Sequence, residues 1–200
     1  LCDGKVERPL VSIVGNLSPS TEDKPSLLTF DEVETIFHEF GHALHGMLSN
    51  VTYSSLASPD VYWDFVELPS QIMENWLGEK ETLQLFAKHY ETQEDIPDEL
   101  IEKIKASQAF NKGLWSLRQL SLGFLDMAWH TTDPLNIDNV AEFEKQAMEK
   151  TRLLPRVDGA NISCSFGHIF AGGYSAGYYS YKWAEALDAD AFEHFKEKGI

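Results

Sequence analysis

Apolar residues recur every three to four positions along most of this chain, which is the spacing of one face of an α-helix. The pattern predicts helices over residues 31–49, 65–77, 80–91, 98–130, 138–153 and 174–197. A short continuous apolar run at residues 9–16 is typical of a buried strand. No internal repeat or domain boundary is visible, so we predict a mainly α fold with minor β and one domain over residues 1–200.

The ends of two predicted helices have recognisable capping residues. Asp31 and Glu34 have the spacing of a capping box at the start of the first helix. Asp64 has the position of an N-cap for the helix over 65–77, and Gly78 is suited to end that helix.

The first predicted helix contains the sequence His38-Glu39-Phe40-Gly41-His42, a His-Glu-x-x-His motif. On a helix, His38 and His42 lie one turn apart on the same face, so both imidazoles can reach one metal ion. Zinc suits imidazole nitrogen, which binds it at about 2.0–2.1 Å. Glu39 points to the side of such a metal and could accept a proton from a metal-bound water. The motif therefore predicts a metal-dependent hydrolase.

A catalytic zinc usually has three protein ligands and one position open to water. Glu67 and Glu74 both lie on the next long predicted helix and share a face of it, so spacing alone leaves either as the third ligand. Glu67, which follows His42 by one loop, is favoured. His45 shares the stripe of the two motif histidines and is expected to pack beside them or to orient a ligand.

Composition excludes several other classes of protein. The net charge of −16 would repel a phosphate backbone, so we expect no nucleic-acid partner. No apolar run approaches the ~20 residues that cross a bilayer, and no basic-then-apolar leader is visible, so we expect no membrane association. The two cysteines, Cys2 and Cys164, form no disulfide framework. Reduced thiols favour a cytoplasmic location, although the chain does not begin with Met.

Three stretches resemble the thimet-oligopeptidase family of zinc peptidases, in order and in spacing. The first is the motif helix around residues 37–45, and the second is Asp64-Phe-Val-Glu-Leu-Pro-Ser-Gln71 with Glu74-Asn75-Trp76. The third is Phe166-Gly-His-Ile-Phe-Ala-Gly-Gly-Tyr-Ser-Ala-Gly-Tyr-Tyr-Ser-Tyr181. The resemblance implies a gluzincin-type helical catalytic core, in which the motif helix packs against a second, ligand-bearing helix. It also implies a parent protein longer at both ends, of which this chain is the zinc-containing part.

By this resemblance, His38, His42 and Glu67 are the ligands of one Zn2+ per chain, and Glu39 is the general base. Glu74 becomes a residue that orients a ligand histidine. Substrate contacts fall at the third stretch, where the implied residues are His168, Gly172, Gly173, Tyr174, Tyr178 and Tyr181. Of these, His168, Tyr178 and Tyr181 are implied to stabilise the tetrahedral intermediate. Helical spacing would place the three tyrosines on one face, where an aromatic packing stripe is the alternative interpretation.

The sequence thus predicts a zinc endopeptidase that hydrolyses short oligopeptides. A peptidyl-dipeptidase of the same family is the first alternative. Trp63 stands where many relatives have arginine, and it favours the oligopeptidase members over the dipeptidyl carboxypeptidases. A non-catalytic zinc-binding domain is a second alternative, but it would leave Glu39 without a role. The sequence does not determine the oligomeric state, and a monomer is expected.

Overall fold

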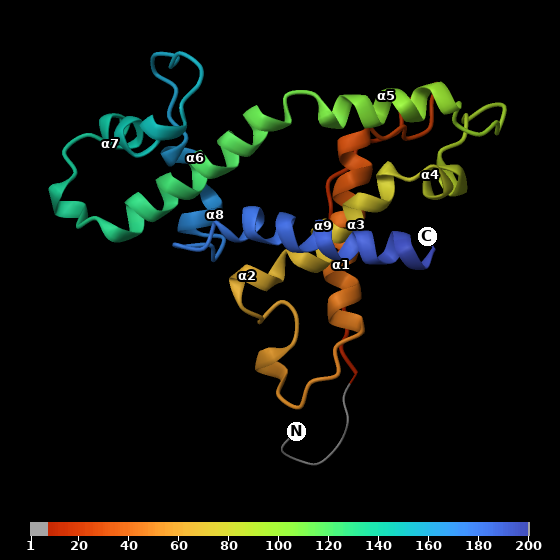
Figure 1. Ribbon diagram of the computed structural model, residues 1–200, viewed down its shortest axis with the longest axis horizontal. Helices are drawn as coiled ribbons and strands as arrows, with labels where there is room; N and C mark the ends of the chain where they lie inside the picture. Colours follow the sequence, from red (N-terminus) through yellow and green to blue (C-terminus); the bar gives the residue numbers. More distant parts are fainter. Residues whose placement is uncertain (1–7, 200) are drawn as a thin grey trace. The chain divides into compact units, whose positions relative to one another are not determined.

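A computed structural model describes residues 8–199 of the chain, and α-helix dominates it (Figure 1). Within this part of the chain, β structure is limited to one isolated bridge between Lys88 and Asp95, which confirms the mainly α prediction. The strand predicted for residues 9–16 is wrong. Those residues are exposed and meet no ladder partner among the described residues, so their backbone gains no sheet hydrogen bonds. Cys2 lies outside the described residues, and Cys164 is an exposed free thiol.

The described residues divide into two compact units. The first unit runs up to Ala109 and resumes at Ala184. Its helices are α1 (Phe30–Met47), η1 (Ser54–Leu56), α2 (Trp63–Val66), α3 (Leu68–Asn75), η2 (Trp76–Gly78), α4 (Lys80–Phe86), α5 (Asp98–Ala109) and the later part of α9 (Ser180–Lys198). Its core is formed by Leu77, Leu83 and Ile101, against which apolar residues of α1 pack. Among the described residues, no helix is long and apolar enough to cross a membrane.

Helix α1 begins at Phe30, so the predicted capping box at Asp31 and Glu34 is wrong by two residues. Thr29 is the N-cap, and its hydroxyl accepts the Glu32 N–H while the Glu32 carboxylate accepts the Thr29 N–H at 2.8 Å. Phe30 packs against the core of the first unit, and this burial moves the start of the helix upstream. The Thr29 and Ser18 N–H groups that Glu32 accepts hold its pKa down at about 2.

The helix predicted over residues 65–77 is interrupted at Glu67, where α2 ends and α3 begins. Pro69 explains the break, because it has no N–H to donate to the carbonyl four residues earlier. The predicted N-cap Asp64 is wrong as well, since α2 begins at Trp63, two residues before the predicted start, and Tyr62 is its N-cap. The interruption places Glu67 at a corner of the backbone rather than on the side of a continuous helix.

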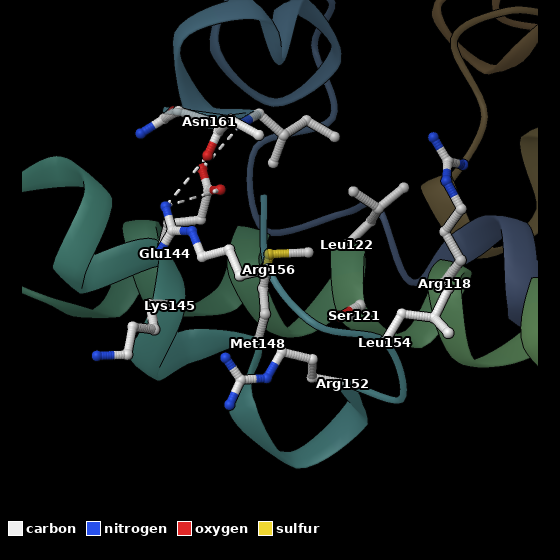
Figure 2. Close-up of a pocket in the computed structure, with 12 residues that line it drawn as sticks. Arg118, Ser121, Leu122, Glu144, Lys145, Met148, Arg152, Leu154, Arg156 and Asn161 are labelled. Carbon is white, nitrogen blue, oxygen red and sulfur yellow. Dashed lines mark hydrogen bonds and ion pairs between the residues drawn. The ribbon is translucent and has the colours of Figure 1, made fainter. Parts of the chain in front are cut away.

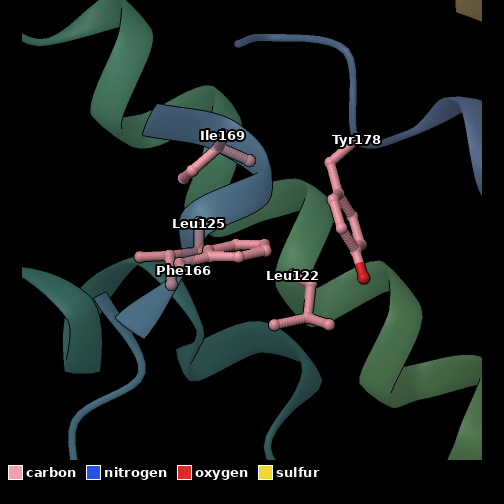
Figure 3. Close-up of a cluster of buried hydrophobic side chains, with 5 residues drawn as sticks. All are labelled: Leu122, Leu125, Phe166, Ile169 and Tyr178. Carbon is pink, nitrogen blue, oxygen red and sulfur yellow. The ribbon is translucent and has the colours of Figure 1, made fainter. Parts of the chain in front are cut away.

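The second unit covers residues 110–183. Its helices are α6 (Lys112–Thr131), η3 (Pro134–Asn136), α7 (Val140–Ala147), η4 (Glu149–Thr151), η5 (Ser163–Ser165), α8 (Gly167–Phe170) and the first residues of α9. Its core contains Leu122, Leu125, Phe166, Ile169 and Tyr178, which Figure 3 shows gathered between α6 and α8.

Three predicted helices that reach this unit are shorter in the structure. The helix predicted over 98–130 breaks at Asn111, whose φ of 55° is left-handed. The helix predicted over 138–153 ends at Ala147 and continues only as the short η4. The last helix begins at Ser180 rather than 174, because Gly173 and Ala176 have positive φ values and form turns instead.

Candidate metal centre

Helix α1 presents His38 and His42 on one face, one turn apart, with their rings edge to face at 5.0 Å. The Nε2 atom of each histidine lies 3.3 Å from the same Glu67 oxygen, Oε2. Within the part of the chain that the structure describes, these three residues are the one group of this kind, with donor atoms all within 4.8 Å of one another. The structure therefore brings together the three side chains that the sequence predicted as ligands.

The spacing of these donor atoms fits a four-coordinate zinc ion. Ligands at about 2.0–2.1 Å in a tetrahedron lie roughly 3.3–3.4 Å from one another. Both His-to-Glu separations, at 3.3 Å, match that edge. Two imidazole nitrogens and one carboxylate are also a donor set that zinc accepts in catalytic sites, with the fourth position left to water. The residues present therefore fit the metal that the motif implies.

Gly41 explains how Glu67 comes so close to α1. It is buried between the two histidines, and a Cβ built on it would lie 2.2 Å from the Pro69 carbonyl oxygen and 2.5 Å from the Ser70 Cα. Real Cβ atoms do not approach backbone so closely, so only glycine lets α3 pack at this distance. The backbone of α3, and with it Glu67, is thereby held against the histidine face. The sequence contained one signal for this role, because an isolated glycine inside a helix usually has a packing reason.

The Glu67 carboxylate is only 1% exposed. Burying a carboxylate without a partner is costly, so each of its contacts matters. Ser70, one turn into α3, has a single hydroxyl hydrogen that is shared between Glu67 Oε2 at 2.9 Å and the Glu67 carbonyl oxygen at 2.8 Å. Ser70 is itself fully buried, and sequence reasoning missed it because a serine at this spacing has many other uses.

Glu74 lies behind His38, with its Oε1 atom 2.5 Å from His38 Nδ1. With a metal bound, a carboxylate on this nitrogen would favour the tautomer that is protonated at Nδ1 and leaves the Nε2 lone pair for the metal. Burial by itself lowers the pKa of His38, but the hydrogen bonds and charges of Glu67 and Glu74 outweigh it and raise the pKa to about 10. The same negative potential favours a bound cation.

The pKa of Glu34 is raised, first by burial and then by the negative charges of Glu74 and Asp31. Acidic groups thus surround the outer side of His38 as well as its metal-facing side.

His45 lies beside the cluster and is not one of its three donors. Its ring meets Phe65 edge-on at 5.7 Å, and its buried Nδ1 has no hydrogen-bond partner among the described residues. Burial, followed by the neighbouring His42, lowers its pKa, so the neutral ring is favoured. These contacts agree with packing beside the motif histidines. Glu39 is half-buried on α1 and forms no hydrogen bond or ion pair with the residues that the structure describes.

The second unit gathers the aromatic residues of the third stretch. The ring of His168 lies 6.1 Å from that of Tyr174, 5.9 Å from Tyr178 and 6.4 Å from Tyr181. The Tyr174 and Tyr181 rings stack at 5.3 Å. Tyr174 and Tyr178 belong to turns, so helical spacing, which predicted one face for the three phenols, is the wrong reason for their proximity.

The two glycines of this stretch that the sequence predicted as substrate contacts, Gly172 and Gly173, both have a structural use. A Cβ on Gly172 would lie 2.9 Å from the Cα of His168, and Gly173 adopts a φ of 85°. The first keeps the chain close to the histidine, and the second makes the turn that follows.

A pocket of about 300 Å³ lies elsewhere in the second unit, between α6, α7 and the segment after η4 (Figure 2). Four basic side chains line it, those of Arg118, Lys145, Arg152 and Arg156. Glu144 also lines the pocket, and its carboxylate accepts hydrogen bonds from the backbone N–H groups of Ile162 and Ser163. None of the site residues predicted from the sequence lines this pocket.

Fold and site together define a mainly helical protein with a candidate metal centre of the gluzincin type. The model of peptidase family M3 matches residues 1–200, and the chain belongs to that family.

Among known proteins, the chain is 47% identical over 197 residues to the organellar oligopeptidase A of Arabidopsis thaliana, covering 98% of this chain and 25% of the relative. It is 42% identical over 200 residues to oligopeptidase A of Escherichia coli, covering 99% and 29%. It is 40% identical over 194 residues to the dipeptidyl carboxypeptidase of Salmonella typhimurium, covering 96% and 28%. The chain thus spans less than a third of the length of these relatives.

Proposed function

We propose that this chain is the zinc-binding catalytic part of a metallo-oligopeptidase that cleaves internal bonds of short peptides. The observation that carries the proposal is the pair of 3.3 Å separations between Glu67 Oε2 and the two motif histidines. Membership of peptidase family M3 supports hydrolysis of peptide bonds as the reaction. We further propose that residues 1–200 belong to one catalytic domain.

In this proposal His38, His42 and Glu67 hold one Zn2+, which when bound supplies a polarised water and a Lewis acid for the scissile carbonyl. Glu74 holds the His38 ring in the orientation that ligation needs. Three donors leave a position for water, whereas a closed structural site would need a fourth protein ligand. That difference favours a catalytic site over a purely structural one.

Glu39 is proposed as the general base. Its carboxylate takes a proton from the attacking water and later gives that proton to the leaving amine. His168, Tyr178 and Tyr181 are proposed to donate hydrogen bonds to the oxyanion of the tetrahedral intermediate. Gly172, Gly173 and Tyr174 are proposed to contact the substrate, because glycine leaves backbone groups accessible to a peptide.

A metal analysis tests the proposed ligands directly. Purified chain should contain about one zinc ion, and a Glu67→Ala variant should lose it, since two histidines alone bind zinc weakly. Glu149→Ala, on an exposed glutamate of the second unit, is the matched control and should retain the metal. Zinc retained equally in Glu67→Ala would refute this ligand set.

The relatives do not separate an endopeptidase from a peptidyl-dipeptidase, because proteins named oligopeptidase A and dipeptidyl carboxypeptidase match this chain at similar identity. Trp63 is the residue that favours the endopeptidase. Product analysis on one peptide, with either a free or an amidated C-terminus, separates the two. We expect equal cleavage of both, whereas release of C-terminal dipeptides from the free form alone would assign the alternative.

Oligopeptides are the proposed partners, with no nucleic acid or membrane, and a monomer is the proposed state. A cytoplasmic location is proposed from the reduced-thiol interpretation. Relatives include one named as a probable cytosolic oligopeptidase A and one named as chloroplastic or mitochondrial, so fractionation of the source cells is the appropriate test.

A further inference from the structure

The second unit contains a buried carboxylate that none of the steps above uses. Asp126 lies on α6 and has no exposed surface. Each of its oxygens accepts one backbone N–H from the turns that follow α8: Oδ1 accepts that of Ala176 and Oδ2 that of Tyr178, both at 2.9 Å. His130, one turn along the helix, places its Nδ1 atom 2.8 Å from Oδ1. The same Nδ1 atom lies 2.9 Å from the Asp126 carbonyl oxygen. The contacts of this carboxylate are therefore directed at one segment and one histidine.

The segment held by Asp126 has a backbone that does not form readily without outside contacts. Ala176 adopts a φ of 53°, a left-handed conformation that is unfavourable for a residue with a Cβ. Its neighbour Ser175 donates a hydroxyl to the Ile169 carbonyl at 2.7 Å. A carboxylate that accepts two N–H groups at alternate residues fixes such a turn more strongly than neutral acceptors would.

The same turns hold the aromatic cluster of the third stretch. The N–H of Tyr178 binds Asp126, while its ring lies 5.0 Å from Phe166 and 5.9 Å from His168. Tyr181, on the first turn of α9, lies 5.0 Å from the Tyr178 ring. Figure 3 shows the Tyr178 ring extending beside Leu122, one turn before Asp126 on α6. The backbone of Tyr178 is therefore held by Asp126, while its ring lies beside that of His168.

We propose that Asp126 is a positioning residue for peptide hydrolysis, which acts by clamping the 173–178 turns so that Tyr178 and His168 keep their mutual geometry. This inference rests on the proposed function, because it assigns a purpose to residues that the proposal places around the oxyanion. Asp126 touches no substrate in this scheme.

The clamp can be tested by amide hydrogen exchange followed by NMR, which does not depend on activity. Asp126→Asn is nearly isosteric but replaces one acceptor oxygen with a donor NH2 group, so at least one of the two bonds is lost. Loss of a hydrogen bond to a charged acceptor should speed exchange of the Ala176 and Tyr178 amides roughly ten- to a hundredfold. Amides of α6 itself should keep their protection. Unchanged exchange at both loop amides would overturn the proposal.

Glu144→Gln is the matched control. Glu144 is also a buried carboxylate of the second unit, 6% exposed, and also accepts two backbone N–H groups, but those of Ile162 and Ser163. Both N–H groups bind the same oxygen, Oε2, which the amide oxygen of glutamine can replace, so this variant removes a buried charge without having to release a segment. It should leave Ala176 and Tyr178 unaffected. A response at Ala176 and Tyr178 equal to that of Asp126→Asn would show general loosening and overturn the specific role.

Kinetics of the zinc-loaded full-length protein, of which this chain is proposed to be the zinc-binding part, then test the catalytic purpose. Asp126→Asn should lower kcat at least tenfold with KM changed less than about threefold, because the displaced groups act on the transition state. Glu144→Gln should change neither by as much. Equal losses in the two variants would overturn the positioning role. If the unaltered full-length protein hydrolyses no peptide although it binds zinc, the proposed function fails. The positioning role then fails with it, even where the exchange data confirm the clamp.

A measurement without any substitution covers the case in which Asp126→Asn does not fold. Scalar couplings across hydrogen bonds should connect the Asp126 carboxyl carbon to the amide nitrogens of Ala176 and Tyr178 in the unaltered chain. Their absence in a well-resolved spectrum would overturn the clamp itself.

Discussion

Replacement of Gly41 by alanine is the change that should most directly separate the two halves of the candidate metal centre. The new Cβ would lie 2.2 Å from the Pro69 carbonyl oxygen, whereas an ordinary contact begins at 3.4 Å. To relieve this clash, α1 and α3 must move apart by about 1 Å. Both obstructing atoms belong to the backbone, so no rotamer change can move them. Metal–ligand distances tolerate only about 0.2 Å, so Glu67 would leave bonding range.

Two opposing terms determine the effect of Gly41→Ala on folding. Alanine is favoured over glycine inside a helix by about 1 kcal/mol. Overpacking of a closely packed interior costs about 1–3 kcal/mol, and a clash against backbone belongs at the upper end. We expect a net loss of about 2 kcal/mol in the free energy of unfolding of the metal-free chain.

Zinc affinity should fall more than stability. Substitutions that only misorient a ligand already cost about 10- to 100-fold in metal affinity, and displacement of Glu67 should cost at least 100-fold. Competition titration against a chelator measures the affinity, and urea denaturation measures the stability.

Gly113→Ala provides the control for helix propensity. Gly113 also lies in a helix, and a Cβ there would meet nothing within 4 Å. That variant should be unchanged or more stable by up to about 1 kcal/mol, with unaltered zinc affinity. Wild-type zinc affinity in Gly41→Ala would refute the argument that this glycine sets the approach of Glu67 to the histidines.

Three further predictions follow from the same structure. Glu39→Gln should keep zinc at the wild-type level by elemental analysis yet lose about 100- to 10,000-fold in kcat, and substantial residual hydrolysis would exclude Glu39 as the general base. Glu74→Gln should weaken zinc binding about 10- to 100-fold in a chelator titration without removing any ligand, whereas unchanged affinity would show that His38 needs no orientation. Because Glu32 has its pKa lowered from 4.5 to about 2, its cap stabilises the folded chain fully above pH 4.5, and this contribution is lost as the pH falls towards 2. Circular dichroism against pH should show a shallower acid loss in Glu32→Gln, and identical profiles would contradict the capping role.

Much of the candidate site could be predicted from the sequence because its information is local. The four-residue spacing of His38 and His42 places them on one helix face whatever surrounds that helix, and α1 confirms the spacing. Helical periodicity likewise predicted a mainly α chain, which the structure confirms. The ends of elements were predicted less well. The start of α1 at Thr29 depends on the burial of Phe30, and a capping pattern two residues away fits the sequence equally well.

The remaining features required tertiary structure, because they depend on residues far apart in the chain. Spacing left Glu67 and Glu74 as alternatives, and only the packing of α3 on Gly41 puts Glu67 on the Nε2 side of His38 and Glu74 on its Nδ1 side. In the sequence, Asp126 has no feature that separates it from other polar residues of its helix. Its role depends on two N–H groups from turns about 50 residues later in the chain. A sequence therefore determines which chemical groups a helix face can offer, whereas close backbone approach and burial determine which of them meet. Close backbone approach and burial depend on the volume and hydrogen bonding of segments far apart in the chain, which no local sequence pattern encodes.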